Sequence, residues 1–110
     1  MTITKTELRT FVLNATPERY NLTQEENNKR HADYAATVSQ AFKAEHIDGF
    51  TIQEVAGYWQ GTPEKSYLIT VATDNTDDSI ERVASVLREV YEQDAVMLTY
   101  PTGKVAFIEA

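Results

Sequence analysis

Four side chains that lie close together in the sequence are candidates for chemistry. The stretch GYWQGTPEKSYLITV, residues 57–71, carries Tyr58 and Trp59 at the end of one apolar run, and Glu64 and Lys65 at the start of the next. A tyrosine combines a hydroxyl with an aromatic face, and such a face attracts a cation. The acid and the base either belong to a site or are solvated residues of a turn.

Tyr58 and Trp59 are consecutive, and consecutive side chains of a strand point to opposite faces of a sheet. One of the two aromatics can therefore join the core while the other faces whatever covers the second side of the sheet. Packing is the favoured interpretation for Trp59. For Tyr58, packing and function are about equally supported.

The usual catalytic groups have no recognisable pattern here. The sequence has no cysteine, which excludes disulfides, a thiolate nucleophile and cysteine-ligated zinc. It also lacks a phosphate-binding loop, a dinucleotide-binding fingerprint and a histidine pair at metal-binding spacing, so we expect no cofactor and no metal. For His31 and His46, the favoured interpretation is an ordinary residue of a helix and not a catalytic base. The acidic run DNTDD, residues 74–78, lacks the glycine and spacing of a calcium loop and favours a helix N-terminus.

Length and charge bound the class of protein. A chain of 110 residues is long enough for one domain, which we assign to residues 1–110. A net charge of −7 argues against a nucleic-acid surface and favours a cationic ligand. No stretch resembles a signal peptide or a membrane span, so we expect a cytoplasmic protein with no membrane partner.

The first half of the chain predicts a strand and a helix. Residues 7–15 are predicted to form an apolar strand, which Pro17 ends. Thr23 precedes Glu26 by three residues, the spacing of a capping box, and predicts the start of a helix of about 20 residues. Its buried stripe is predicted at Ala35, Val38 and Phe42. Gly49 is predicted to be the left-handed residue that ends it.

The second half predicts a hairpin, a helix and two more strands. Residues 50–59 and 65–74 alternate as strands joined by the turn QGTPE, with a candidate bulge at Gly57. Asp77 or Asp78 caps a second helix. The predicted buried stripe of that helix consists of Ile80, Val83, Leu87 and Val90. Strands at 95–100 and 104–109 follow.

This order predicts an α+β fold. Strand, helix, strand, strand, helix, strand is the ferredoxin-like βαββαβ arrangement, with an antiparallel sheet, two helices on one face and a short C-terminal strand added. The other face of the sheet is left uncovered, and residues 66–73 offer bulky side chains to both faces. A partner or a second copy is therefore expected.

In that framework the sequence resembles the phage S-adenosylmethionine lyases, formerly called hydrolases. The resemblance rests on RH early in the first helix, then GYW, then EKS opening a strand, then a helix ending in YEQDAV, and it covers residues 21–110. It implies a homotrimer that binds substrate between subunits and cleaves S-adenosylmethionine to methylthioadenosine and homoserine lactone. For a phage it implies an anti-restriction role in the host cytoplasm, through depletion of the methyl donor.

The resemblance also implies the site residues. Tyr58 and Glu64 fall on its catalytic and substrate-binding positions, Tyr58 near the sulfonium and Glu64 at the α-ammonium. Glu92, Gln93 and Met97 are further substrate-binding candidates, for which a helix end and the core are the other interpretation. The loop between Tyr58 and Glu64 is shorter than the family pattern. The alternative function is a non-catalytic, oligomeric ligand-binding or regulatory protein on the same fold.

Overall fold

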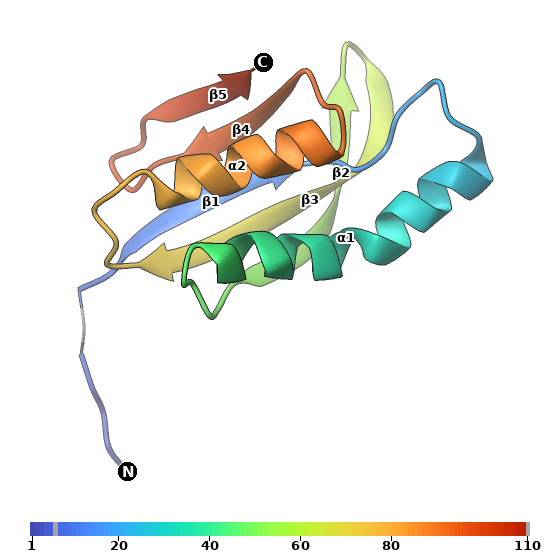
Figure 1. Ribbon diagram of the computed structural model, residues 1–110. Coiled ribbons are helices and arrows are strands. Elements are labelled where there is room, and N and C mark those ends of the chain that lie inside the picture. The colour runs from blue at the N-terminus through green and yellow to red at the C-terminus, as the bar shows by residue number, and fades with distance from the viewer. Residues whose placement is uncertain (6, 110) are drawn as a thin grey trace.

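The computed structural model describes residues 1–5 and 7–109, and the side chain of Trp59, for which core packing was predicted, lies outside the described set. The chain forms seven elements in the described part (Figure 1). They are β1 (Arg9–Ala15), α1 (Gln24–Ala44), β2 (Thr51–Trp59), β3 (Thr62–Thr73), α2 (Ser79–Val90), β4 (Ala95–Thr99) and β5 (Val105–Glu109).

The strands form one antiparallel sheet in the order β2-β3-β1-β4-β5. Both helices lie against the same face of that sheet, as Figure 1 shows. The first four strands have the ferredoxin-like order, and β5 extends the edge beyond β4. The predicted fold class is confirmed.

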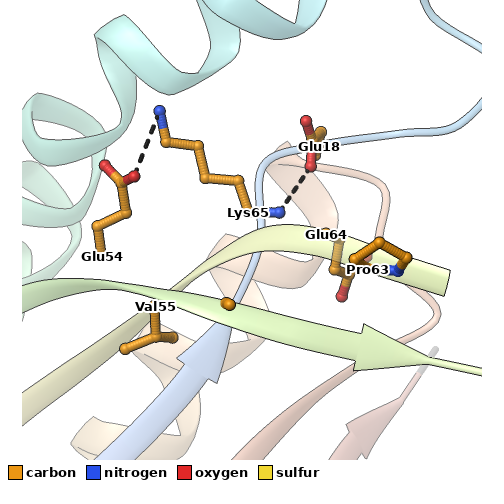
Figure 2. Close-up of a pocket in the computed structure, with 7 residues that line it drawn as sticks. Glu18, Glu54, Val55, Pro63, Glu64 and Lys65 are labelled. Atoms are coloured by element: carbon orange, nitrogen blue, oxygen red, sulfur yellow. Dashed lines mark hydrogen bonds and ion pairs between the residues drawn. The ribbon is translucent and has the colours of Figure 1, made fainter. Parts of the chain in front are cut away.

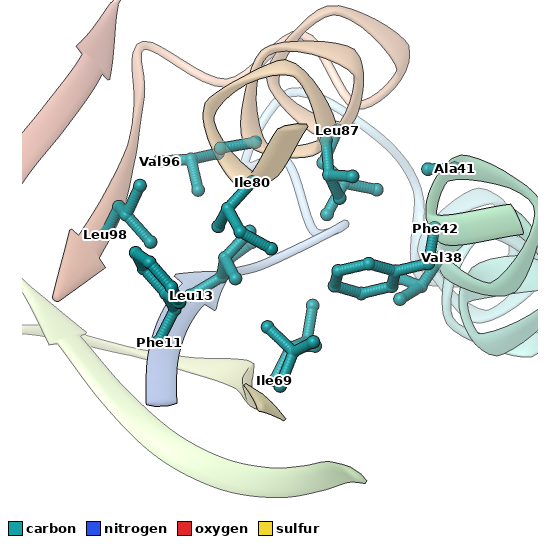
Figure 3. Packing of buried hydrophobic residues seen from close by; sticks show 14 of the residues in the cluster. Phe11, Leu13, Val38, Ala41, Phe42, Ile69, Ile80, Leu87, Val96 and Leu98 are labelled. Atoms are coloured by element: carbon teal, nitrogen blue, oxygen red, sulfur yellow. The ribbon is translucent and has the colours of Figure 1, made fainter. Parts of the chain in front are cut away.

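The core lies between the helices and the sheet (Figure 3). Alternation along each strand turns one set of side chains toward the helices, where they meet the apolar stripes of α1 and α2. The largest buried side chains from the strands are Phe11, Leu13, Ile69, Val71, Val96 and Leu98. Those from the helices are Tyr34, Val38, Phe42, Ile80, Val83 and Leu87.

The start of α1 is as predicted and its end is not. Thr23 Oγ accepts the Glu26 N–H (3.1 Å) and the Glu26 carboxylate accepts the Thr23 N–H (3.2 Å), which completes the capping box. The left-handed residue is His46 (φ 60°), not Gly49. The Ile47 N–H then donates to the Phe42 carbonyl (3.0 Å) and places the Ile47 side chain in the core. Burial of Ile47 therefore determines where α1 ends.

Two further local predictions are wrong. Ala35 is exposed and Tyr34 occupies the buried stripe of α1. Val90 is exposed, and the stripe of α2 ends in buried Tyr91 instead. The predicted start of the second helix is confirmed: Asp78 is the N-cap residue of α2, and the side-chain hydrogen bond comes from Asp77, whose carboxylate accepts the Ser79 N–H (3.1 Å). The helix-terminus interpretation of DNTDD stands.

The second face of the sheet has no helix over it in the described part of the chain (Figure 1). Leu68, Asn14, Met97 and Phe107 are paired in one row across β3, β1, β4 and β5. The first three are half-buried, and Phe107 is 59% exposed. We call the face that carries this row the open face. None of the described helices is long and apolar enough to cross a membrane.

Candidate functional site

The hairpin between β2 and β3 is tighter than the sequence predicts. Its turn is only Gln60 and Gly61, both with positive φ (49° and 80°), as a two-residue hairpin turn requires. Residues 62–64, predicted in the turn, belong to β3 instead. Pairing also continues without a bulge through Gly57, which lies opposite Glu64. Glu64 is therefore a strand residue with a defined direction.

The same register separates the two predicted catalytic residues. Tyr58 pairs with Pro63 and Glu64 pairs with Gly57, so they occupy adjacent rungs of the ladder. Adjacent positions point to opposite faces, and within one chain the two side chains do not converge. Tyr58 is 73% exposed, whereas Glu64 is half-buried on the side of the open face.

Glu64 lines a hollow of about 440 Å³ at the root of the hairpin (Figure 2). The lining residues are Glu18, Glu54, Val55, Ala56, Pro63, Glu64 and Lys65. Three of these are carboxylates and one is a cation, so the hollow has a negative balance that favours a cationic ligand. Lys65 turns its ammonium toward Glu54 (Nζ to Oε1, 3.5 Å) and leaves the other two acids without that partner.

Glu18 was not singled out by the sequence patterns, yet its carboxylate is fixed at the backbone of Lys65, the residue that follows Glu64. The Lys65 N–H donates to Glu18 Oε2 (2.9 Å), and the Thr16 hydroxyl donates to the Lys65 carbonyl (2.6 Å). These two side chains take over the hydrogen bonds that a further residue of β1 would have made. The acid just past Pro17 could have been recognised as a candidate, because the first and third strands of a ferredoxin-like sheet are antiparallel neighbours, so the end of the first lies beside the start of the third.

Burial and a like charge act on Glu64. Partial burial disfavours its charged form and raises its pKa, and the neighbouring carboxylate of Glu18 raises the pKa further. A carboxylate held in this way gains most from a bound cation, because the cation offsets both effects. Gly57 opposite leaves the necessary space, since a Cβ there would lie 3.2 Å from Ser66 Cβ and 3.6 Å from Glu64 Cγ.

The three remaining candidates lie apart from one another. Glu92 is exposed, has positive φ (55°), and pairs with Arg19 (3.5 Å) and Arg30 (3.4 Å). The Gln93 side-chain amide donates to the carbonyls of Tyr91 (3.0 Å) and Glu18 (3.4 Å), so it supports the segment that carries Glu18. Met97 lies in β4 on the open face.

Of the two histidines, only His31 lies near this hollow. Its Nε2 is 3.6 Å from Glu18 Oε1. His46 lines a second acidic hollow with Glu45 and residues 74–77, where α1 ends and α2 begins. Within residues 1–5 and 7–109, His, Asp and Glu side chains form no cluster of three suited to a metal ion.

Replacing Glu18 tests the electrostatics of the hollow. Glu18→Gln removes a negative charge but keeps an oxygen that can accept the Lys65 N–H, so the pKa of Glu64 is expected to fall while staying above its ordinary value. NMR titration of the side-chain carboxyl carbons measures this shift. Glu54→Gln is the control and should leave the pKa of Glu64 unchanged, because Glu54 faces Lys65. An unchanged pKa in Glu18→Gln would contradict the arrangement.

Solved structures of other proteins share the fold of this chain. A comparison with curated proteins finds no match. Among solved structures, a phage S-adenosylmethionine lyase in complex with S-methyl-5'-thioadenosine is similar at a TM-score of 0.67 and 16% identity, over 100% of this chain and 95% of that one. A phage S-adenosylmethionine lyase in the apo state is similar at 0.60 and 18%, over 93% and 89%.

These structural likenesses establish the fold, and the sequence itself establishes the family. The profile of the S-adenosylmethionine lyase family matches residues 14–110, which include every residue that lines the hollow. The chain belongs to the S-adenosylmethionine lyase family.

Proposed function

We propose that this lyase converts S-adenosylmethionine to 5'-methylthioadenosine and L-homoserine lactone by intramolecular attack. The substrate's own carboxylate oxygen forms a bond to its γ-carbon, the carbon–sulfur bond breaks, and the electron pair leaves with sulfur as a neutral thioether. No proton is transferred in this step. The observation that carries the proposal is the acid-lined hollow with Glu64, in a chain that matches the lyase family over residues 14–110.

The task of the protein in such a reaction is orientation. Holding the carboxylate near the γ-carbon supplies an intramolecular advantage without a protein nucleophile. Glu64 pairs with the α-ammonium and fixes the rotation of the methionine chain, with its raised pKa falling as the cation binds. The ring and hydroxyl of Tyr58 contact the sulfonium end. The product held by one similar structure, S-methyl-5'-thioadenosine, fits this cleavage.

If Tyr58 and Glu64 contact one substrate molecule, as we propose, the site requires more than one copy of the chain. Tyr58 is exposed and points away from the face toward which Glu64 points, so one hairpin cannot present both to one ligand. A homotrimer with sites between subunits would bring Tyr58 of one copy to Glu64 of another. We assign Glu92, Gln93 and Met97 to the adenosine end or the neighbouring wall of that site. Depletion of the methyl donor in a host cytoplasm would then serve anti-restriction.

Product analysis tests the reaction. Purified protein incubated with S-adenosylmethionine should yield methylthioadenosine and homoserine lactone by chromatography. Glu64→Gln should lower kcat/KM by about 10- to 100-fold, the effect expected when a hydrogen bond to a charged group is lost. Tyr58→Phe keeps the ring and should cost about fivefold. Unchanged substrate after hours would refute the lyase activity and favour the non-catalytic binding alternative, and homoserine as the first product would indicate hydrolysis.

The space opposite Glu64 gives a second test. Gly57→Ala places a methyl group 3.2 Å from Ser66 Cβ, closer than ordinary contact, and 3.6 Å from Glu64 Cγ, so Ser66 and the strand that carries Glu64 must shift by a few tenths of an ångström and kcat/KM should fall severalfold with the fold retained. Gly49→Ala is the matched control, since a Cβ there meets no atom within 4 Å. Equal activity of the two variants would show that the position of Glu64 does not matter.

The molar mass of the protein in solution tests the proposed homotrimer. In sedimentation equilibrium, the wild-type protein should have three times the chain mass. Leu68→Glu places a charge on the half-buried open face and should shift the protein to lower mass, because a buried unpaired charge is costly. Val86→Glu, at an exposed position of α2, should not change the mass. A monomeric wild type that is fully active would contradict a shared site.

A further inference from the structure

We infer that Glu18 is a second substrate-binding carboxylate and that His31 is the positioning residue that holds it. His31 Nε2 lies 3.6 Å from Glu18 Oε1, and Glu18 lines the hollow together with Glu64. The inference rests on the proposed function, which it deepens by naming a second group for the cationic end of the substrate.

His31 is a buried polar side chain with one unsatisfied nitrogen. Its side chain is only 9% exposed, and Nε2 is buried without a hydrogen-bond partner. A buried polar atom of this kind usually has a partner, and the nearest carboxylate is that of Glu18. The histidine therefore faces the site rather than solvent.

The other ring nitrogen decides how the histidine is oriented. Nδ1 lies 3.0 Å from the Tyr67 hydroxyl. If that hydroxyl donates, as we assign it, the neutral ring carries its proton on Nε2 and presents it to Glu18. Tyr67 is held in turn by Tyr34, with ring centroids 4.5 Å apart. Packing in the core thus fixes the direction of the histidine.

Glu18 is then held from two sides. The Lys65 N–H donates to Oε2 (2.9 Å), and His31 faces Oε1. With Lys65 Nζ directed to Glu54, the pair of Glu18 and Glu64 has a net negative charge at the hollow. An ammonium group has three N–H donors, and one that pairs with Glu64 at the hollow is also attracted by the charge of Glu18. The two acids together select an α-ammonium over a neutral ligand.

The experiment compares ligands that do and do not carry this ammonium. S-adenosylhomocysteine keeps the amino-acid end, whereas methylthioadenosine lacks it. Calorimetry with each ligand is performed on the intact assembled protein, alongside KM and kcat for S-adenosylmethionine. Glu18→Gln should weaken S-adenosylhomocysteine binding and raise KM by about 10-fold, the lower range for a hydrogen bond to a charged group, with methylthioadenosine binding unchanged.

Two near-isosteric variants separate the nitrogens of His31. His31→Asn keeps an amide near the position of Nδ1 and loses the reach to Glu18, so it should behave like Glu18→Gln. His31→Gln places an amide near Nε2 and should keep S-adenosylhomocysteine affinity within about twofold of wild type. His46→Gln, at the second hollow, is the control and should change none of the values.

The binding and kinetic results for these variants support or refute the roles of Glu18 and His31. If Glu18→Gln leaves S-adenosylhomocysteine affinity and KM unchanged, Glu18 does not contact the substrate. If His31→Asn and His31→Gln weaken both ligands equally, His31 has only a structural role. A wild-type protein that does not turn over S-adenosylmethionine would refute the proposed reaction, while the comparison of the two ligands would still decide the role of Glu18.

Discussion

The backbone of Lys65 needs hydrogen-bond partners at a point where β1 has already ended. Pro17 has no N–H and follows Ala15 by two residues, so β1 cannot continue the ladder beside β3. The side chains of Thr16 and Glu18 make those bonds instead. These bonds hold the Glu18 carboxylate at the backbone of Lys65, the residue that follows Glu64, and the electrostatics of the hollow depend on it.

A second contact keeps that segment in place. The Arg30 guanidinium donates to the carbonyls of Pro17 and Tyr91, pairs with Glu92, and lies over the Tyr91 ring at 5.4 Å. One planar cation thus ties α1 to the end of β1 and to the end of α2, a role for which its fork of donors is suited. Glu92 therefore has a supporting contact independent of any ligand.

The sequence patterns predicted the fold more completely than the site. Hydrophobic alternation and the capping box of Thr23 are local, and they predicted the element order correctly. The relation of Tyr58 to Glu64 depends on a turn only two residues long, and one residue of difference reverses the face to which Glu64 points. Glu18 lies 47 residues from Lys65 along the chain, so no local pattern could pair them. Their contact follows from the strand order alone.

The hollow in a single chain is open to solvent, while the proposed reaction benefits from a dry pocket. Attraction between a carboxylate and an ammonium is weak in water and grows as water is excluded. The open face, toward which Glu64 points, also holds apolar side chains such as Leu68 and Met97, and in the described part of the chain no helix covers them. Covering this face with another copy would remove water from Glu64 and supply the missing aromatic ring. The same subunit contact would thus complete the fold and the site.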